Sequence, residues 1–190
     1  MKFKTISILC IVVSVMTSLI PEILAQEFKE YESKFLGIKL QFPVEWENTM
    51  SEEEIIDFVS DDVTGKKISF GISDTENGLP LLIENVLTIS VRETDATNLL
   101  ELQTETLEPF QTLGKFMNYD LLETINITLN KYEAAKFIHT QEINEKEKVM
   151  QIVSLINSKN YSIVYKIHEE LFDKYLETIE KIINSIQIIK

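Results

Sequence analysis

The sequence contains little of what most catalytic and metal-binding sites are built from. Among its 190 residues there is one cysteine, Cys10, and there are two histidines. Cys10 lies in an N-terminal apolar segment that we expect to be removed, so the mature chain has no thiol for a disulfide, a thiolate metal site or a cysteine nucleophile. The five glycines do not cluster as a phosphate-binding loop requires, and no GxSxG nucleophile motif occurs. The composition therefore argues against an enzyme.

Basic residues are also scarce: 18 lysines and arginines stand against 31 aspartates and glutamates, a formal net charge of −13. Nucleic-acid binding depends on neutralising phosphates with lysine and arginine, so this charge excludes a nucleic-acid partner. An anionic membrane face would repel the chain in the same way. We interpret the acidity as a source of solubility.

Long apolar runs are confined to the N-terminus. Two lysines precede an apolar run over residues 6–20, and the small residue Ala25 follows it. This order is typical of a secretory signal peptide, residues 1–25, and the alternative is an uncleaved N-terminal anchor. No later run approaches the length of a membrane span, so we expect residues 26–190 to form a single extracytoplasmic domain, secreted or at the cell surface.

The stretch GIKLQFPVEW, residues 37–46, shows how the domain is built. Apolar and polar residues alternate up to Phe42, which predicts a half-buried strand. Pro43 cannot donate to a sheet ladder, so it should end the strand or lie at an edge. Trp46 then follows the strand end, where we expect its ring to fold back as a structural plug over the core.

Similar patterns predict the rest of an α+β domain with a mostly antiparallel sheet covered by helices. Strands are predicted at residues 55–60, 68–72, 87–91, 125–129, 135–139, 149–158 and 161–167. The run 149–158 is apolar on both faces, which indicates a central strand. The turn-rich residues 73–80 predict a loop.

Three helices are expected. Helical spacing over residues 97–114 predicts one that Pro109 should kink or end early. An apolar stripe over residues 172–186, with two glutamates before it, predicts a closing C-terminal helix. Ser51, followed by three glutamates, predicts the cap and first turn of a short helix.

Two segments of the chain resemble PsbP-like domains, relatives of the extrinsic PsbP subunit of photosystem II. LGIKLQFPVEW, residues 36–46, resembles their first strand, and YSIVYKIHEELFDKYLETIEKIINSIQI, residues 161–188, resembles their last strand and closing helix. The resemblance covers residues 28–188 and implies an α/β/α sandwich with a central, mostly antiparallel sheet. Ran-binding Mog-type proteins and bacterial DcrB-type lipoproteins share that fold, and secreted archaeal proteins of this kind have a similar composition rich in lysine, isoleucine and glutamate.

The same resemblance implies a binding or assembly module rather than an enzyme. Plant photosynthetic members are associated with calcium and manganese, but no ligand set of theirs transfers to numbered positions here. The chain also departs from the family at residues 131–135, KYEAA, where relatives often carry glycine and small residues.

The metal-binding candidates among the residues are carboxylates and one histidine. Asp57, Asp61 and Asp62 could supply oxygen ligands to Ca²⁺ or Mn²⁺, and His168 is followed by two glutamates. Neither group has the ligand spacing of an EF-hand. We favour a solvated loop and a helix N-terminus, and predict no cofactor, with calcium or manganese as the alternative.

Three further residues are singled out by their surroundings. His139 shares the strand face of Phe137, and we expect it at a rim or interface. Asn126 and Asn160 begin N-x-S/T triplets, one on an outward strand position and one in the turn before the last long strand. Both are candidate glycosylation sites.

The function that these features favour is an exported, non-enzymatic PsbP-like module that binds a protein at the cell surface or in a membrane complex. A divalent-cation or small-ligand binding protein is the alternative. A carboxylate hydrolase is a remote one, because the many acidic residues make any chosen pair arbitrary.

Overall fold

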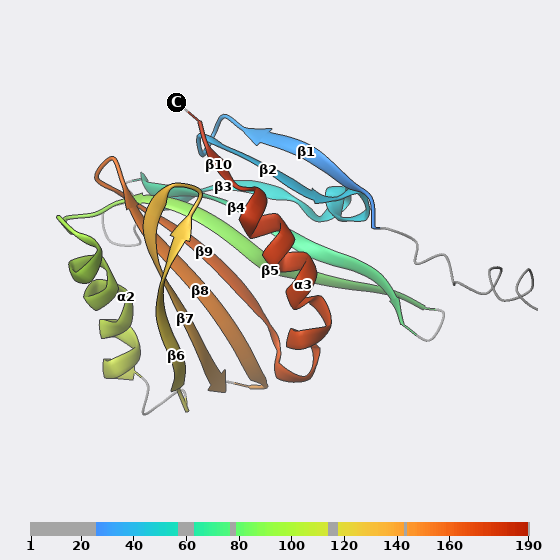
Figure 1. The fold of residues 1–190 in the computed structure, drawn as a ribbon. Coiled ribbons are helices and arrows are strands. Elements are labelled where there is room, and N and C mark those ends of the chain that lie inside the picture. Colours follow the sequence, from blue (N-terminus) through green and yellow to red (C-terminus); the bar gives the residue numbers. More distant parts are fainter. Residues whose placement is uncertain (1–25, 57–62, 77–78, 114–117, 143, 190) are drawn as a thin grey trace, which may run out of the picture.

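The computed structural model describes residues 26–56, 63–76, 79–113, 118–142 and 144–189, which form a large antiparallel sheet with a layer on each face (Figure 1). The strands of the large sheet are β3 (Ser51–Ile56), β4 (Val63–Glu76), β5 (Leu79–Glu93), β6 (Asp120–Leu129), β7 (Tyr132–Glu142), β8 (Lys146–Ile156) and β9 (Lys159–His168). Their order across the sheet is β3-β4-β5-β9-β8-β7-β6, and every neighbouring pair is antiparallel. The prediction of a mostly antiparallel sheet is confirmed.

The central strand β8 explains why the domain has a layer on both sides. Successive strand residues point to opposite faces. Ile152 belongs to the large core under the C-terminal helix, whereas its neighbour Val153 belongs to a smaller apolar cluster with Phe137 and Leu102. The apolar run of residues 149–158 is therefore covered on both faces, as expected for a central strand.

The larger core lies under α3 (Glu169–Ser185), whose amphipathic character was evident from sequence. Its buried side chains are Phe172, Tyr175, Ile179, Ile182 and Ile183. At the start of the helix, the buried Tyr165 hydroxyl donates a hydrogen bond of 2.8 Å to the Phe172 carbonyl. This bond ties the helix to β9 immediately before it, so the last strand and the closing helix form one unit.

A second sheet shares this side of the molecule with α3 (Figure 1). It contains β1 (Phe28–Ser33), β2 (Ile38–Pro43) and the two-residue β10 (Gln187–Ile188), in the order β1-β2-β10. The strand predicted up to Phe42 is confirmed as β2, which ends at Pro43. Because three strands lie beside α3 and a single helix covers the other face, the layers are richer in strand than the expected α/β/α sandwich.

The short helix predicted at Ser51 is wrong, because this segment forms the edge strand β3. Glu53 lies opposite Lys67 on β4, and the two side chains form an ion pair of 2.7 Å. Glu52 accepts hydrogen bonds from Tyr31 and Ser33 on β1. The glutamates are therefore partnered across strands, which outweighs the local capping preference.

The loop predicted at residues 73–80 is also wrong in most of its length. β4 and β5 stay paired as far as Glu76 and Leu79, so they form a long hairpin that extends beyond the neighbouring strands (Figure 1). Residues 77–78, between the two strands, lie outside the described part. The backbone pairing continues through positions whose side chains are typical of turns.

The helix predicted over residues 97–114 is confirmed as α2 (Leu99–Leu113), but Pro109 lies inside it and does not end it early. Proline removes one hydrogen bond of the helix. Phe110, the next residue, stacks on Tyr119 with ring centroids 4.7 Å apart, which holds the last turn in place. Among the residues described, neither helix has the length and apolar character needed to cross a bilayer.

Candidate functional site: a polar cleft beside α2

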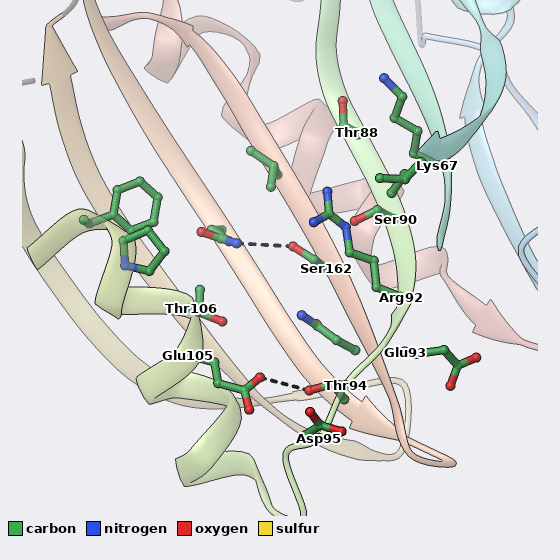
Figure 2. A pocket seen from close by; sticks show the side chains of 16 residues that line it. Lys67, Thr88, Ser90, Arg92, Glu93, Thr94, Asp95, Glu105, Thr106 and Ser162 are labelled. Carbon is green, nitrogen blue, oxygen red and sulfur yellow. Dashed lines mark hydrogen bonds between the residues drawn. The ribbon is translucent and has the colours of Figure 1, made fainter. Parts of the chain in front are cut away.

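A cleft of about 760 Å³ lies on the α2 face of the large sheet (Figure 2). α2 packs on β7 and β8 and leaves β5 and β9 open on this face. We call this space the α2 cleft; α2 forms one wall and the strands β3 and β4 form the other. The lining residues are Ile55, Lys67, Thr88, Ser90, Arg92, Glu93, Thr94, Asp95, Glu105, Thr106, Pro109, Phe110, Gln151, Asn160, Ser162 and Val164.

The floor of the α2 cleft is polar because of simple strand alternation. On β5, Thr88, Ser90 and Arg92 point into the cleft (Figure 2), while the apolar residues between them belong to the core under α3. Ser162 on β9 lies directly opposite Ser90. A row of hydroxyl groups therefore runs across the sheet where an apolar core would otherwise be expected.

Arg92 is the single arginine of the chain. Its side chain is exposed and forms no ion pair with any described residue. Gly65 lies opposite it on β4, and a Cβ at this glycine would stand 2.7 Å from Arg92 Cγ. A side chain at position 65 would collide with the base of the Arg92 side chain, whose guanidinium is turned toward Ser90 and Ser162 (Figure 2).

Two other cations near the α2 cleft are already paired. Lys67 binds Glu53, and this hydrogen bond lowers the pKa of the Glu53 carboxyl below its ordinary value. Lys159 binds Glu93 at 3.0 Å. Arg92 is therefore the cation in the lining that is available to an anionic group.

The opposite end of the α2 cleft carries carboxylates. Glu105 Oε2 on α2 accepts a hydrogen bond of 2.9 Å from the Thr94 hydroxyl, which itself accepts from the Ala96 N–H at 3.2 Å. Thr94 thus orients Glu105, whose other oxygen, Oε1, has no hydrogen bond to any described residue. Asp95 lies beside them at the same end (Figure 2).

Two polar groups on the floor are only partly satisfied. Gln151 Nε2 donates to Ser162 Oγ at 3.3 Å, so the serine oxygen acts as acceptor and its own hydrogen remains able to donate. Asn160 Oδ1 is buried and accepts no hydrogen bond from any described residue. Buried amide oxygens are normally paired, so this one is open to a donor from water or from a ligand in the cleft.

His139 lies in an aromatic cluster next to Phe110 of the α2 wall. The ring of Phe110, which lines the cleft, is 5.0 Å from the His139 ring, and Tyr119 is 4.7 Å from it. The histidine is 1% exposed, so the prediction of a rim position is wrong, although it does share a buried face with Phe137. Desolvation by burial lowers the pKa of His139 to about 4, and its Nδ1 has no hydrogen-bond partner in the part of the chain that the structure describes.

The predicted metal candidates do not converge in the described structure. Asp57, Asp61 and Asp62 lie outside the described residues. His168 is the half-buried last residue of β9, and the adjacent Glu169 pairs with Lys146 at 2.7 Å. Across the described ranges, no group of three or more histidine, cysteine, aspartate or glutamate side chains is arranged to hold a metal ion.

The two candidate glycosylation sites differ in their surroundings. Asn126 is exposed on β6, and its Oδ1 accepts a hydrogen bond from Gln103 of α2 at 3.1 Å. Asn160 lies within β9 rather than in the preceding turn, is half-buried and lines the α2 cleft. Trp46 is 2% exposed, in the 3-10 helix η2 (Val44–Thr49).

Sequence reasoning did not find the α2 cleft. Its floor residues read as the solvent-facing half of ordinary strands, since Thr88, Ser90 and Ser162 alternate with apolar neighbours. The one available signal was Arg92, a lone arginine on a strand of a strongly acidic chain.

The fold defined by this sheet and its two layers is PsbP-like. A cyanobacterial PsbP (CyanoP) from Synechocystis superposes with a TM-score of 0.53 at 10% identity, covering 86% of this chain and 93% of that one. LpqN, described as involved in cell envelope biogenesis of Mycobacterium tuberculosis, superposes with a TM-score of 0.53 at 12% identity, covering 87% and 92%. At such low identity the similarity concerns the fold alone.

Sequence comparison adds nothing to this assignment. No family model matches the chain, and no curated protein matches it.

Proposed function

We propose that this protein is an exported, non-catalytic binding module that holds its partner in the α2 cleft. The observation that carries the proposal is the lining of the cleft: polar, open to solvent, with an available guanidinium at one side and an oriented carboxylate at the other. Ligand sites of proteins are concave and contain a few placed polar groups. The α2 cleft has that form.

The absence of an activated nucleophile in the lining supports binding rather than catalysis. Ser90 and Ser162 would need an adjacent base to attack a substrate. Both histidines lie outside the lining, His139 behind Phe110 and His168 at the end of β9. Ser162 instead accepts a hydrogen bond from Gln151, an amide that cannot take up its proton.

A photo-crosslinking experiment tests the proposal. Ile55 lines the rim of the α2 cleft and would be replaced by benzoylphenylalanine, which is also large and apolar. Leu100, 71% exposed on α2 and outside the lining, is the matched control position. After irradiation in cells of the source organism, we expect a discrete adduct from position 55 and none from position 100. Identical adduct patterns at the two positions, or none at 55, would contradict the proposal.

Export has its own test. The basic and apolar N-terminal segments predict cleavage before Gln26. We therefore expect the protein recovered from cells to have lost residues 1–25, as measured by the mass of the intact protein and of its N-terminal peptide. An intact N-terminus in a membrane fraction would show the anchored form instead, and an intact protein in the cytoplasm would contradict export.

A further inference from the structure

We infer that the ligand of the α2 cleft is the carboxylate-terminated end of a peptide that also carries a cationic group. This inference rests on the proposed function, because it names the chemistry of the ligand for the same site. The groups that carry it are Arg92 with the serine hydroxyls on one side and Glu105 with Asp95 on the other. Their signs are opposite, and both face one cleft.

The carboxylate end is recognised at Arg92. A guanidinium offers two parallel N–H donors that match the two oxygens of a carboxylate. The Ser162 hydroxyl accepts from Gln151 and donates to no described side chain, so its hydrogen is available to a ligand. Arg92 and Ser90 lie two residues apart on the same strand face, so both can reach one anionic group.

The cationic end is recognised at Glu105 and Asp95. The Thr94 hydroxyl holds Glu105 Oε2, which leaves Oε1 for a ligand donor. The buried Asn160 Oδ1 requires a donor as well, and peptide N–H groups supply one. A ligand with both a carboxylate and N–H or ammonium donors satisfies every one of these groups.

The charges of the lining argue against a polyanionic ligand. The cation at Arg92 faces carboxylates at Glu105 and Asp95, and the whole chain has a formal net charge of −13. A phosphate group would meet one available guanidinium and two repelling carboxylates. A cleft of about 760 Å³ is also within the usual size for a ligand of a few residues.

The test uses the chain from Gln26 onward, which contains every described strand and helix, and defined peptides as probes. Binding would be measured by amide chemical-shift titration. Triglycine carries both charges, acetyl-triglycine carries only the carboxylate, and triglycine amide carries only the ammonium group. We expect triglycine to bind with chemical shifts centred on Ser90, Arg92 and Ser162, acetyl-triglycine to bind several-fold more weakly, and triglycine amide to bind at least about tenfold more weakly.

Acetyl-Lys-Gly-Gly separates the two sources of such a ligand. It places the cation on a side chain, as the C-terminus of a partner protein would. Stronger binding of this peptide than of triglycine identifies a protein C-terminus, and the reverse identifies a free short peptide; both results support the inferred chemistry.

Variants assign the binding to the named groups. Arg92→Ala should lower triglycine affinity about tenfold or more. Arg92→Lys should recover only part of the loss, because lysine lacks the two parallel N–H donors of the guanidinium. Glu105→Gln should weaken triglycine but leave acetyl-triglycine unchanged. Lys181→Ala, on the exposed side of α3, is the matched control and should bind like the parent chain.

Three results would overturn the inference: equal binding of triglycine and its amide, full affinity of Arg92→Ala with an unchanged melting temperature, or binding of inorganic phosphate but of no peptide. A failure of this inference can be distinguished from a failure of the proposed function. If the adduct from position 55 forms and persists in Arg92→Ala, the α2 cleft binds a partner and only the ligand chemistry is wrong.

Discussion

Replacing Trp46 by alanine is expected to destabilise the protein by roughly 3–5 kcal/mol. Trp46 is 2% exposed and belongs to the core cluster that contains Phe42 and Phe70. It lies on η2, which packs against β4, and its removal from a close-packed core leaves a cavity. A loss of this size lowers the melting temperature of a chain of this length by on the order of 10 °C.

The measurement is chemical and thermal unfolding of Trp46→Ala, Trp46→Phe and a control in the same 3-10 helix. Val44→Ala is the control, because Val44 is 40% exposed and its truncation should cost less than about 1 kcal/mol. Trp46→Phe should fall between them. Equal melting temperatures for Trp46→Ala and Val44→Ala would show that the indole does not support the core.

The second large effect is a loss of stability in mild acid that depends on His139. Its folded pKa of about 4 lies below the ordinary value of 6.5, because burial disfavours the charged ring. Between these two values the unfolded chain binds more protons than the folded one, so the free energy of unfolding falls as the pH falls from about 6.5 to 4. The shift corresponds to about 3 kcal/mol, which is a large part of the stability of a typical domain.

Urea unfolding at a series of pH values between 4 and 7 measures this effect. His139→Leu removes the titrating group and keeps an apolar side chain against Phe110, so we expect its unfolding free energy to fall less steeply across this range. His168→Gln removes the other histidine and leaves the cluster of His139 with Phe110 and Tyr119 intact, so the steep fall should persist. The same slope in His139→Leu and in the parent chain would assign the acid sensitivity to carboxylates.

Elements with a strong local pattern were predictable. α3 and β9 each bury one apolar face, and β8 buries apolar residues on both faces. The spacing of apolar residues in these segments therefore predicts the type of element. Each of these elements was expected within a few residues of its observed bounds. The PsbP-like fold followed from the same two ends of the chain, β2 and the β9–α3 unit.

Elements that depend on a distant partner were not predictable. Glu53 favours a helix start by its position after Ser51, but Lys67 lies opposite it and draws the segment into β3. Residues 73–76 contain typical turn formers, yet pairing with β5 continues through them. His139 reads as a surface histidine on its strand, but the rings of Phe110 on α2 and of Tyr119, just before β6, pack against it.

What the sequence by itself determined is the class of the protein: an acidic α+β domain with no thiol in residues 26–190, preceded by a segment with the character of an export signal. Only the tertiary structure decided where a ligand could bind. The polar faces of β5 and β9 form a cleft because α2 covers β7 and β8 and stops short of them. Strand alternation specifies which side chains point away from the core. The position of α2, which comes from another part of the chain, determines whether those side chains face open solvent or line a cleft.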